Sequence, residues 1–141
     1  DFGHPVGNIV LEQVAGTMAQ RVRSCDVLGR VGGDEFLAVL PQTDRREAYV
    51  LAERLREAVE GYVLEIEDGH VIDFIRVSIG VAAYPVNGET MENVVTAADN
   101  AVYQSKDEGG NRVSLADEFI TSDLVGRRIV DAVRGEEAAE Q

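Results

Sequence analysis

The chain has 141 residues, of which 45% are hydrophobic and 28% are charged, so the sequence predicts one folded domain with a substantial core. Its formal net charge is -13 and its pI is near 4.4, which excludes nucleic acid and anionic membrane surfaces as default partners. The single cysteine, Cys25, excludes an internal disulfide and a cysteine-rich zinc site.

No apolar run is long enough to span a bilayer, and no signal peptide is recognisable. We therefore expect a soluble, cytoplasmic domain that makes no membrane contact through this segment. The chain begins at Asp1 rather than at methionine, so tethering through a preceding segment stays open.

The first predicted element is a helix that starts at Gly3-His4-Pro5, because proline suits the first helical position. From Val6 to Val22 a mostly apolar stripe recurs at helical spacing, as expected for an amphipathic helix. Arg23 to Asp26 ends this helix and leads into the next element.

The second element is a β-hairpin from Val27 to Leu40, predicted by two short apolar runs that flank Gly32-Gly33-Asp34-Glu35. Glycine suits a tight tip and lets a large ligand lie against the backbone. Asp34 and Glu35 would stand side by side there, and Mg²⁺ typically takes one or two carboxylates plus substrate phosphates. The pattern alone leaves an ordinary solvated acidic turn open as the alternative.

A second helix is expected to begin after a cap at Thr43 or Asp44 and to end at Gly61. Two strands follow, Tyr62 to Ile66 and Val71 to Tyr84. In the longer strand Gly80 indicates that another element packs closely against the backbone.

The last predicted elements are a helix from Thr90 to Lys106, a short strand from Arg112 to Ser114 and an amphipathic tail from Leu115 to Gln141. Helices that alternate with antiparallel strand pairs indicate an α+β fold, with a mixed, mostly antiparallel sheet flanked by helices. We expect a domain over 1–114 and a helical tail over 115–141.

The string Gly32-Gly33-Asp34-Glu35-Phe36 is the signature of the GGDEF family, the diguanylate cyclases, and the chain resembles this family from about Phe2 to Val113. The resemblance implies a fold similar to the nucleotidyl cyclase and polymerase palm. It also implies condensation of two GTP into cyclic di-GMP, a Mg²⁺ or Mn²⁺ cofactor and a homodimer, because the product is two-fold symmetric.

For the hairpin, the resemblance implies that Asp34 and Glu35 are metal ligands and catalytic residues. An unperturbed Asp is a weak base at neutral pH, so the metal role is favoured over a base role for Asp34. Gly32 and Gly33 would bring their backbone close to the phosphates.

For guanine, Gly3-His4-Pro5-Val6-Gly7-Asn8 is similar to the family's G-H-x-x-G-D, which implies that His4 and Asn8 bind the base. Asn8 replaces an aspartate, and its amide accepts hydrogen bonds through only one atom, so guanine affinity or selectivity is in question. A helix-capping role for His4 and a surface role for Asn8 are the alternatives.

For phosphate, Lys106 keeps the lysine of the family's Y-x-A-K-x-x-G-R-N, whereas Gly110 stands at the arginine position. Arg112 could substitute by reaching back. The alternative for Lys106 is a solvated side chain that complements the helix dipole.

For product inhibition, Arg23-Ser24-Cys25-Asp26 resembles the family's R-x-x-D site and stands five residues before the motif, as in the family. Arg54 falls on the helix that supplies a second inhibitory arginine in some members. An arginine fork suits phosphate or a guanine edge, while Asp accepts from guanine N1–H. Ordinary surface charge pairing is the alternative for all three residues.

The family domain begins with a strand and a helix before G-H, which carry a metal-binding Asp, a Lys and an Asn that this sequence does not contain. We expect a parent protein to supply them and the isolated chain to lack cyclase activity. Two other functions stay open: a degenerate module that binds cyclic di-GMP or GTP without turnover, and a dimerisation module.

Overall fold

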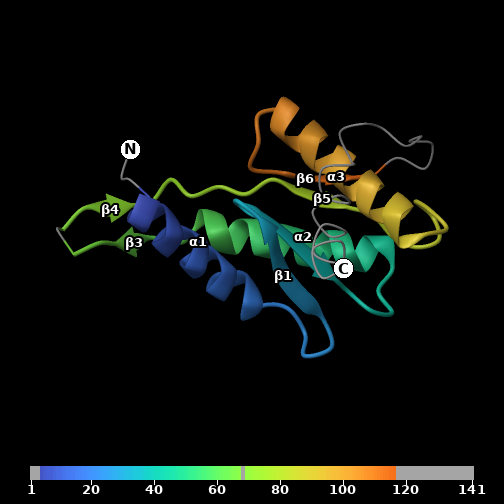
Figure 1. Cartoon of the computed structure of the whole chain (residues 1–141), viewed down its shortest axis with the longest axis horizontal. Coiled ribbons are helices and arrows are strands. Elements are labelled where there is room, and N and C mark those ends of the chain that lie inside the picture. The colour runs from blue at the N-terminus through green and yellow to red at the C-terminus, as the bar shows by residue number, and fades with distance from the viewer. Residues whose placement is uncertain (1–3, 68, 117–141) are drawn as a thin grey trace, which may run out of the picture.

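The computed structural model describes residues 4–67 and 69–116 (Figure 1). Within them the elements follow in the order α1 (His4–Ala19), β1 (Val27–Gly32), β2 (Glu35–Val39), α2 (Arg45–Glu60), β3 (Leu64–Glu65), β4 (Val71–Ile72), β5 (Ile79–Val81), α3 (Met91–Asp107) and β6 (Val113–Leu115). None of the helices in these residues has the length and apolar character that a membrane crossing requires. Of the tail predicted over 115–141, the part after Ala116 lies outside the described residues.

The helix boundaries follow the capping residues in the sequence. Asp44 caps α2, because its side chain accepts a hydrogen bond from the Glu47 N–H at 2.8 Å, and Gly61 ends the helix. Thr90 caps α3 in the same way, accepting from Asn93 N–H at 3.2 Å. Both predicted starts are confirmed.

The strands form three separate pairs in the described residues. β1 pairs with β2 and β3 with β4, both antiparallel, whereas β5 pairs with β6 in parallel. The α+β class is confirmed, but the single strand predicted from Val71 to Tyr84 is wrong. Its first part pairs with β3 and its later part with β6, so the residues between β4 and β5 have no ladder partner in the described structure.

The elements are layered around α2, which contacts α1 on one side and β5 and β6 on the other, while α3 covers the opposite face of β5 and β6 (Figure 1). The main core joins α1, α2, β3, β4 and the segment after β4; its buried residues are Val14, Met18, Leu55, Val59, Leu64, Ile72 and Ile75. Leu28 and Phe36 of the hairpin pack against this core, and so fix one face of the hairpin toward α1.

Gly80 lies where α3 approaches β5, as the sequence predicted. A Cβ at this position would lie 2.0 Å from the Ala98 carbonyl oxygen and 2.6 Å from the Val102 nitrogen. These are backbone atoms that cannot rotate away, so only glycine allows α3 to pack this closely.

Candidate functional site

The tip of the β1–β2 hairpin is an open turn. Gly32 pairs with Glu35, the register is irregular between Arg30 and Gly32, and Gly33 has a φ of 49°. That backbone conformation is one that glycine adopts without strain. A Cβ at Gly32 or Gly33 would meet no atom within 4 Å, so a ligand could approach the backbone at both positions.

Two carboxylates follow this turn. Asp34 is exposed and makes no hydrogen bond or ion pair with the part of the chain that the structure describes, and Glu35 beside it is half-buried. Over residues 4–67 and 69–116, no three His, Cys, Asp or Glu side chains are grouped to hold a metal ion. Two neighbouring carboxylates still fit Mg²⁺, because this ion commonly completes its shell with water and substrate phosphates.

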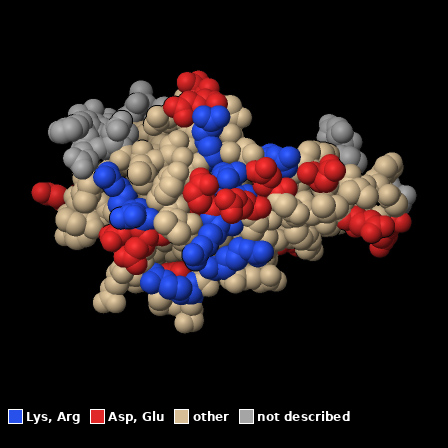
Figure 2. All heavy atoms as spheres, turned by 180° about the vertical axis from the view of Figure 1, so that it is seen from behind, with Lys and Arg blue, Asp and Glu red and all other residues tan. Residues whose placement is uncertain are grey.

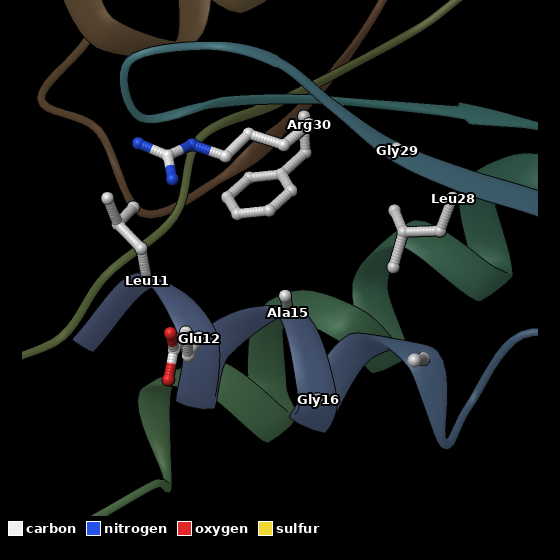
Figure 3. Close-up of a pocket in the computed structure, with 9 residues that line it drawn as sticks. Leu11, Glu12, Ala15, Gly16, Leu28, Gly29 and Arg30 are labelled. Carbon is white, nitrogen blue, oxygen red and sulfur yellow. The ribbon is translucent and has the colours of Figure 1, made fainter. Parts of the chain in front are cut away.

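A cavity of about 360 Å³ lies between α1 and the hairpin (Figure 3). Its walls are mainly apolar and include Leu11, Ala15, Leu28 and Phe36. Such walls suit the faces of a flat ring, and polar contacts to the edge of the ring would fix its orientation in the cavity.

The predicted guanine residues both belong to α1. His4 is the first residue of the helix, and Asn8 is exposed one helical turn before the cavity-lining Leu11 and Glu12. Asn8 does not itself line the cavity. The predicted base-binding residues thus lie at the start of α1, and later residues of the same helix face the hairpin across the cavity.

Lys106 is exposed in the last turn of α3. Figures 1 and 3 both show the loop after α3 on the same side of the molecule as the hairpin tip. In that loop Arg112 reaches back, since its Nε donates to the Gly110 carbonyl at 3.3 Å and its Nη1 lies 3.4 Å from a Glu108 carboxylate oxygen.

Arg23 and Asp26 form a tight pair at the base of the hairpin. The guanidinium Nη2 lies 2.8 Å from Asp26 Oδ1, and the Arg23 N–H donates to Asp26 Oδ2 at 2.7 Å. The same guanidinium donates to the Pro41 carbonyl at 3.0 Å and to the Thr43 hydroxyl. The hydrogen bonds from Arg23 lower the pKa of Asp26, and the bond to Asp26 raises the pKa of Arg23.

Exposure separates the two members of this pair. The Arg23 side chain is 48% exposed, whereas the Asp26 side chain has no exposed surface. A ligand can therefore reach the guanidinium while the carboxylate holds it in place. Arg54, the third predicted residue of this site, is exposed on α2 and has no bond to Arg23 or Asp26 within the described residues.

Basic and acidic side chains are interspersed on the face shown in Figure 2. Ion pairs of this kind occur along α2, where Arg56 lies 3.2 Å from a Glu53 oxygen and 2.7 Å from a Glu60 oxygen. On this face opposite charges therefore lie beside one another and do not form one continuous basic patch.

Comparison with known proteins identifies the family. A family model described as "Diguanylate cyclase, GGDEF domain" matches residues 1–112. The chain belongs to the GGDEF family. Diguanylate cyclase A of Treponema denticola is 40% identical over 115 residues, which are 82% of this chain and 30% of that protein. The response regulator PleD of Caulobacter vibrioides is 38% identical over 112 residues, which are 79% of this chain and 25% of that protein.

Solved GGDEF domains share the fold of this one. The GGDEF domain of DgcB from Caulobacter crescentus, solved in complex with c-di-GMP, has a TM-score of 0.75 and 30% identity, covering 81% of this chain and 67% of that one. The active GGEEF domain of a diguanylate cyclase from Vibrio cholerae has a TM-score of 0.71 and 28% identity, and the match covers 82% of this chain and 72% of that one. The GGDEF domain described here thus spans less than a third of the two curated relatives.

Sequence reasoning missed two features of the site. Arg30 lines the cavity and bonds to the turn, and Thr43 completes the surroundings of Arg23. Arg30 stands only two residues before Gly32, so its position next to the motif was the available signal. Thr43 was considered only as a helix cap, a role that belongs to Asp44.

Proposed function

We propose that this GGDEF domain, spanning 1–114 with 115–141 as a tail, condenses two GTP into cyclic di-GMP as part of a homodimer. The observation that carries the proposal is the exposed Asp34, which follows the open Gly33 turn and has no partner in residues 4–67 and 69–116. Membership of a family of diguanylate cyclases supports it. Since GTP is the substrate, we propose the cytoplasm as the location.

The proposed reaction joins two nucleotides through two phosphodiester bonds. In each, a 3′-hydroxyl of one GTP attacks the α-phosphorus of the other and loses its proton to water. A new P–O bond forms, and pyrophosphate leaves with the electrons of the broken P–O bond. Transfer of this kind depends mainly on positioning and charge stabilisation. A homodimer presents one GTP from each domain, in keeping with the two-fold symmetry of the product.

Different residues of the domain would bind the metal ion and the phosphates. Asp34 and Glu35 would hold a divalent metal, Mg²⁺ or Mn²⁺, which when bound neutralises phosphate charge. Gly32 and Gly33 let the phosphates approach the backbone, and Lys106 supplies a cation from the end of α3.

Guanine recognition in this proposal comes from His4 and Asn8 at the start of α1. Asn8 offers one acceptor atom to the guanine N1–H and N2–H₂ donors, whereas a carboxylate would offer two. Asn8→Asp is therefore expected to tighten GTP binding and to increase discrimination against ATP.

We further propose that Arg23, Asp26 and Arg54 form a product site that inhibits turnover, in which the buried Asp26 carboxylate holds the Arg23 guanidinium in place. The half-exposed, pre-oriented guanidinium of Arg23 supports this, because an arginine fork suits phosphate. The DgcB domain, solved in complex with c-di-GMP, also supports it. A domain that binds cyclic di-GMP without turnover would use the same site, so this is the second candidate function.

The test is an assay of cyclic di-GMP formation from GTP and Mg²⁺ by the protein that carries this domain, with Asp34→Asn and Glu35→Gln beside it. Product from the wild type and its loss in the variants would support the cyclase. Tight cyclic di-GMP binding with no product under any condition would reject the cyclase and favour the receptor.

A further inference from the structure

Arg30 is tied to the hairpin turn by an unusually short bond. Its Nε donates to the Gly33 carbonyl oxygen at 2.6 Å. Gly33 has a φ of 49°, and its carbonyl belongs to the peptide that precedes Asp34. The bond therefore fixes the orientation of the peptide from which the Asp34 side chain projects.

The pairing of β1 with β2 becomes irregular next to Arg30. The pairing shifts between Arg30 and Gly32, so the strand departs from a regular ladder just before the turn. Figure 3 shows the Arg30 side chain extending from β1 toward Leu11 of α1, at the edge of the cavity.

The two Nη groups of Arg30 have no hydrogen-bond or ion-pair partner in the described residues. This is notable in a chain of net charge -13, in which Arg23, Arg56 and Arg112 all pair with carboxylates. Glu12 lines the same cavity, but no hydrogen bond or ion pair joins it to Arg30 in the described residues.

We propose that Arg30 positions the turn through Nε and binds a phosphate of the nucleotide through its two Nη groups. This inference rests on the proposed function and adds a phosphate-binding residue to that site. Asp34 and Glu35 place negative charge next to the bound phosphates, so a cation on the same turn offsets repulsion. The planar fork can donate two parallel hydrogen bonds to phosphate oxygens while Nε keeps its own bond.

The inference is tested with Arg30→Gln, because the glutamine amide can still donate toward Gly33 but carries no charge. Two ligands are compared in the protein that carries this domain: a GTP analogue with a methylene bridge between the α and β phosphorus atoms, and uncharged guanosine. The matched control is Arg46→Gln. It removes an exposed arginine near the start of α2, which follows the end of β2 that is remote from the hairpin tip.

Arg30→Gln should weaken binding of the analogue by roughly ten- to a hundredfold. Guanosine affinity should change by less than about twofold, and Arg46→Gln should leave both ligands within about twofold. Arg30→Gln should also make analogue binding less sensitive to salt, because one charged contact is lost. Thermal unfolding of each variant verifies that the domain is folded.

The outcomes separate this inference from the proposed function. Equal losses for both ligands, or none for the analogue, would overturn the phosphate role of Arg30 even if the wild type makes cyclic di-GMP. Analogue binding with the expected loss, but no product formation by the wild type, would reject the cyclase and keep the phosphate role. A wild type that binds neither ligand would overturn both.

Discussion

The two ends of the β1–β2 hairpin use their charged side chains in opposite ways. At the base, Arg23 and Asp26 bond to each other, and Arg23 also bonds to the Pro41 carbonyl and the Thr43 hydroxyl. At the tip, Asp34 has no partner in the described residues and the two glycines face open space.

With the function proposed above, this difference would give the two ends of the hairpin separate roles. The internal bonds of the base attach the hairpin to the segment before α2 and hold the Arg23 guanidinium in one orientation. At the tip, the Asp34 carboxylate is exposed and has no partner in the described residues, so it is available for a ligand. We infer that the base presents a preformed surface to a product, whereas the tip is completed only when metal and nucleotide bind.

The largest expected effect is on turnover at the tip. Asp34→Asn should lower cyclic di-GMP formation by at least about a hundredfold, because an amide is a far weaker ligand for a hard cation. Product formation is measured by chromatography. Glu65→Gln, an exposed carboxylate on β3, is the control and should change the rate by less than about twofold. Wild-type turnover in Asp34→Asn would remove the metal role of this residue.

A large effect on stability is expected where a glycine is closely packed. Gly80→Ala should lower the free energy of unfolding by about 3 kcal/mol, because its Cβ would collide with the Ala98 carbonyl of α3. Gly33→Ala meets no atom and should cost only about 1 kcal/mol, from its left-handed backbone conformation. Chemical denaturation measures both values. Equal losses of stability in Gly80→Ala and Gly33→Ala would show that the tip is less open than its geometry indicates.

A smaller effect is expected for product binding at the base. Arg23→Ala should weaken cyclic di-GMP binding by about tenfold or more, since it removes the only exposed member of the Arg23–Asp26 pair. Isothermal titration calorimetry measures the affinity. Arg76→Ala removes an exposed arginine between β4 and β5 and serves as the control. Unchanged affinity in Arg23→Ala would reject the base of the hairpin as the product site.

The smallest effect is on the pH dependence of stability. Arg23 lowers the pKa of Asp26 in the folded state, so the unfolded state binds a proton more readily there. The stabilisation is present above the ordinary pKa of Asp, about 3.9, and is lost as the pH falls through the lower folded pKa. Thermal unfolding between about pH 2 and 6 should show that acidification lowers the stability of Asp26→Asn less steeply than that of the wild type. The same dependence of stability on pH in Asp26→Asn and the wild type would contradict a stabilising role for the Asp26 carboxylate.

Local sequence signals were sufficient for much of the fold. Asp44, Gly61 and Thr90 fixed helix boundaries because each acts on neighbouring backbone groups. The Gly32-Gly33 pair located the tip because tight turns require particular residues. The exposed Asp34 was predicted for the same reason.

Features that depend on distant partners could not be predicted in this way. The segment from Val71 to Tyr84 alternates like one strand, yet it divides because β3 and β6 pair with different parts of it. The contact from Arg30 to Gly33 depends on a register shift that has no residue signature. The bonds from Arg23 to the segment before α2 likewise join residues that are far apart in the sequence.

The central claim is that the tip carries turnover while the base binds product, and one titration tests it most directly. Cyclic di-GMP is titrated into the Asp34→Asn protein, whose loss of turnover is measured on the same sample. The account predicts that product affinity equals that of the wild type although turnover is lost. Loss of product affinity together with turnover, in a protein that is still folded, would contradict separate roles for the two ends of the hairpin.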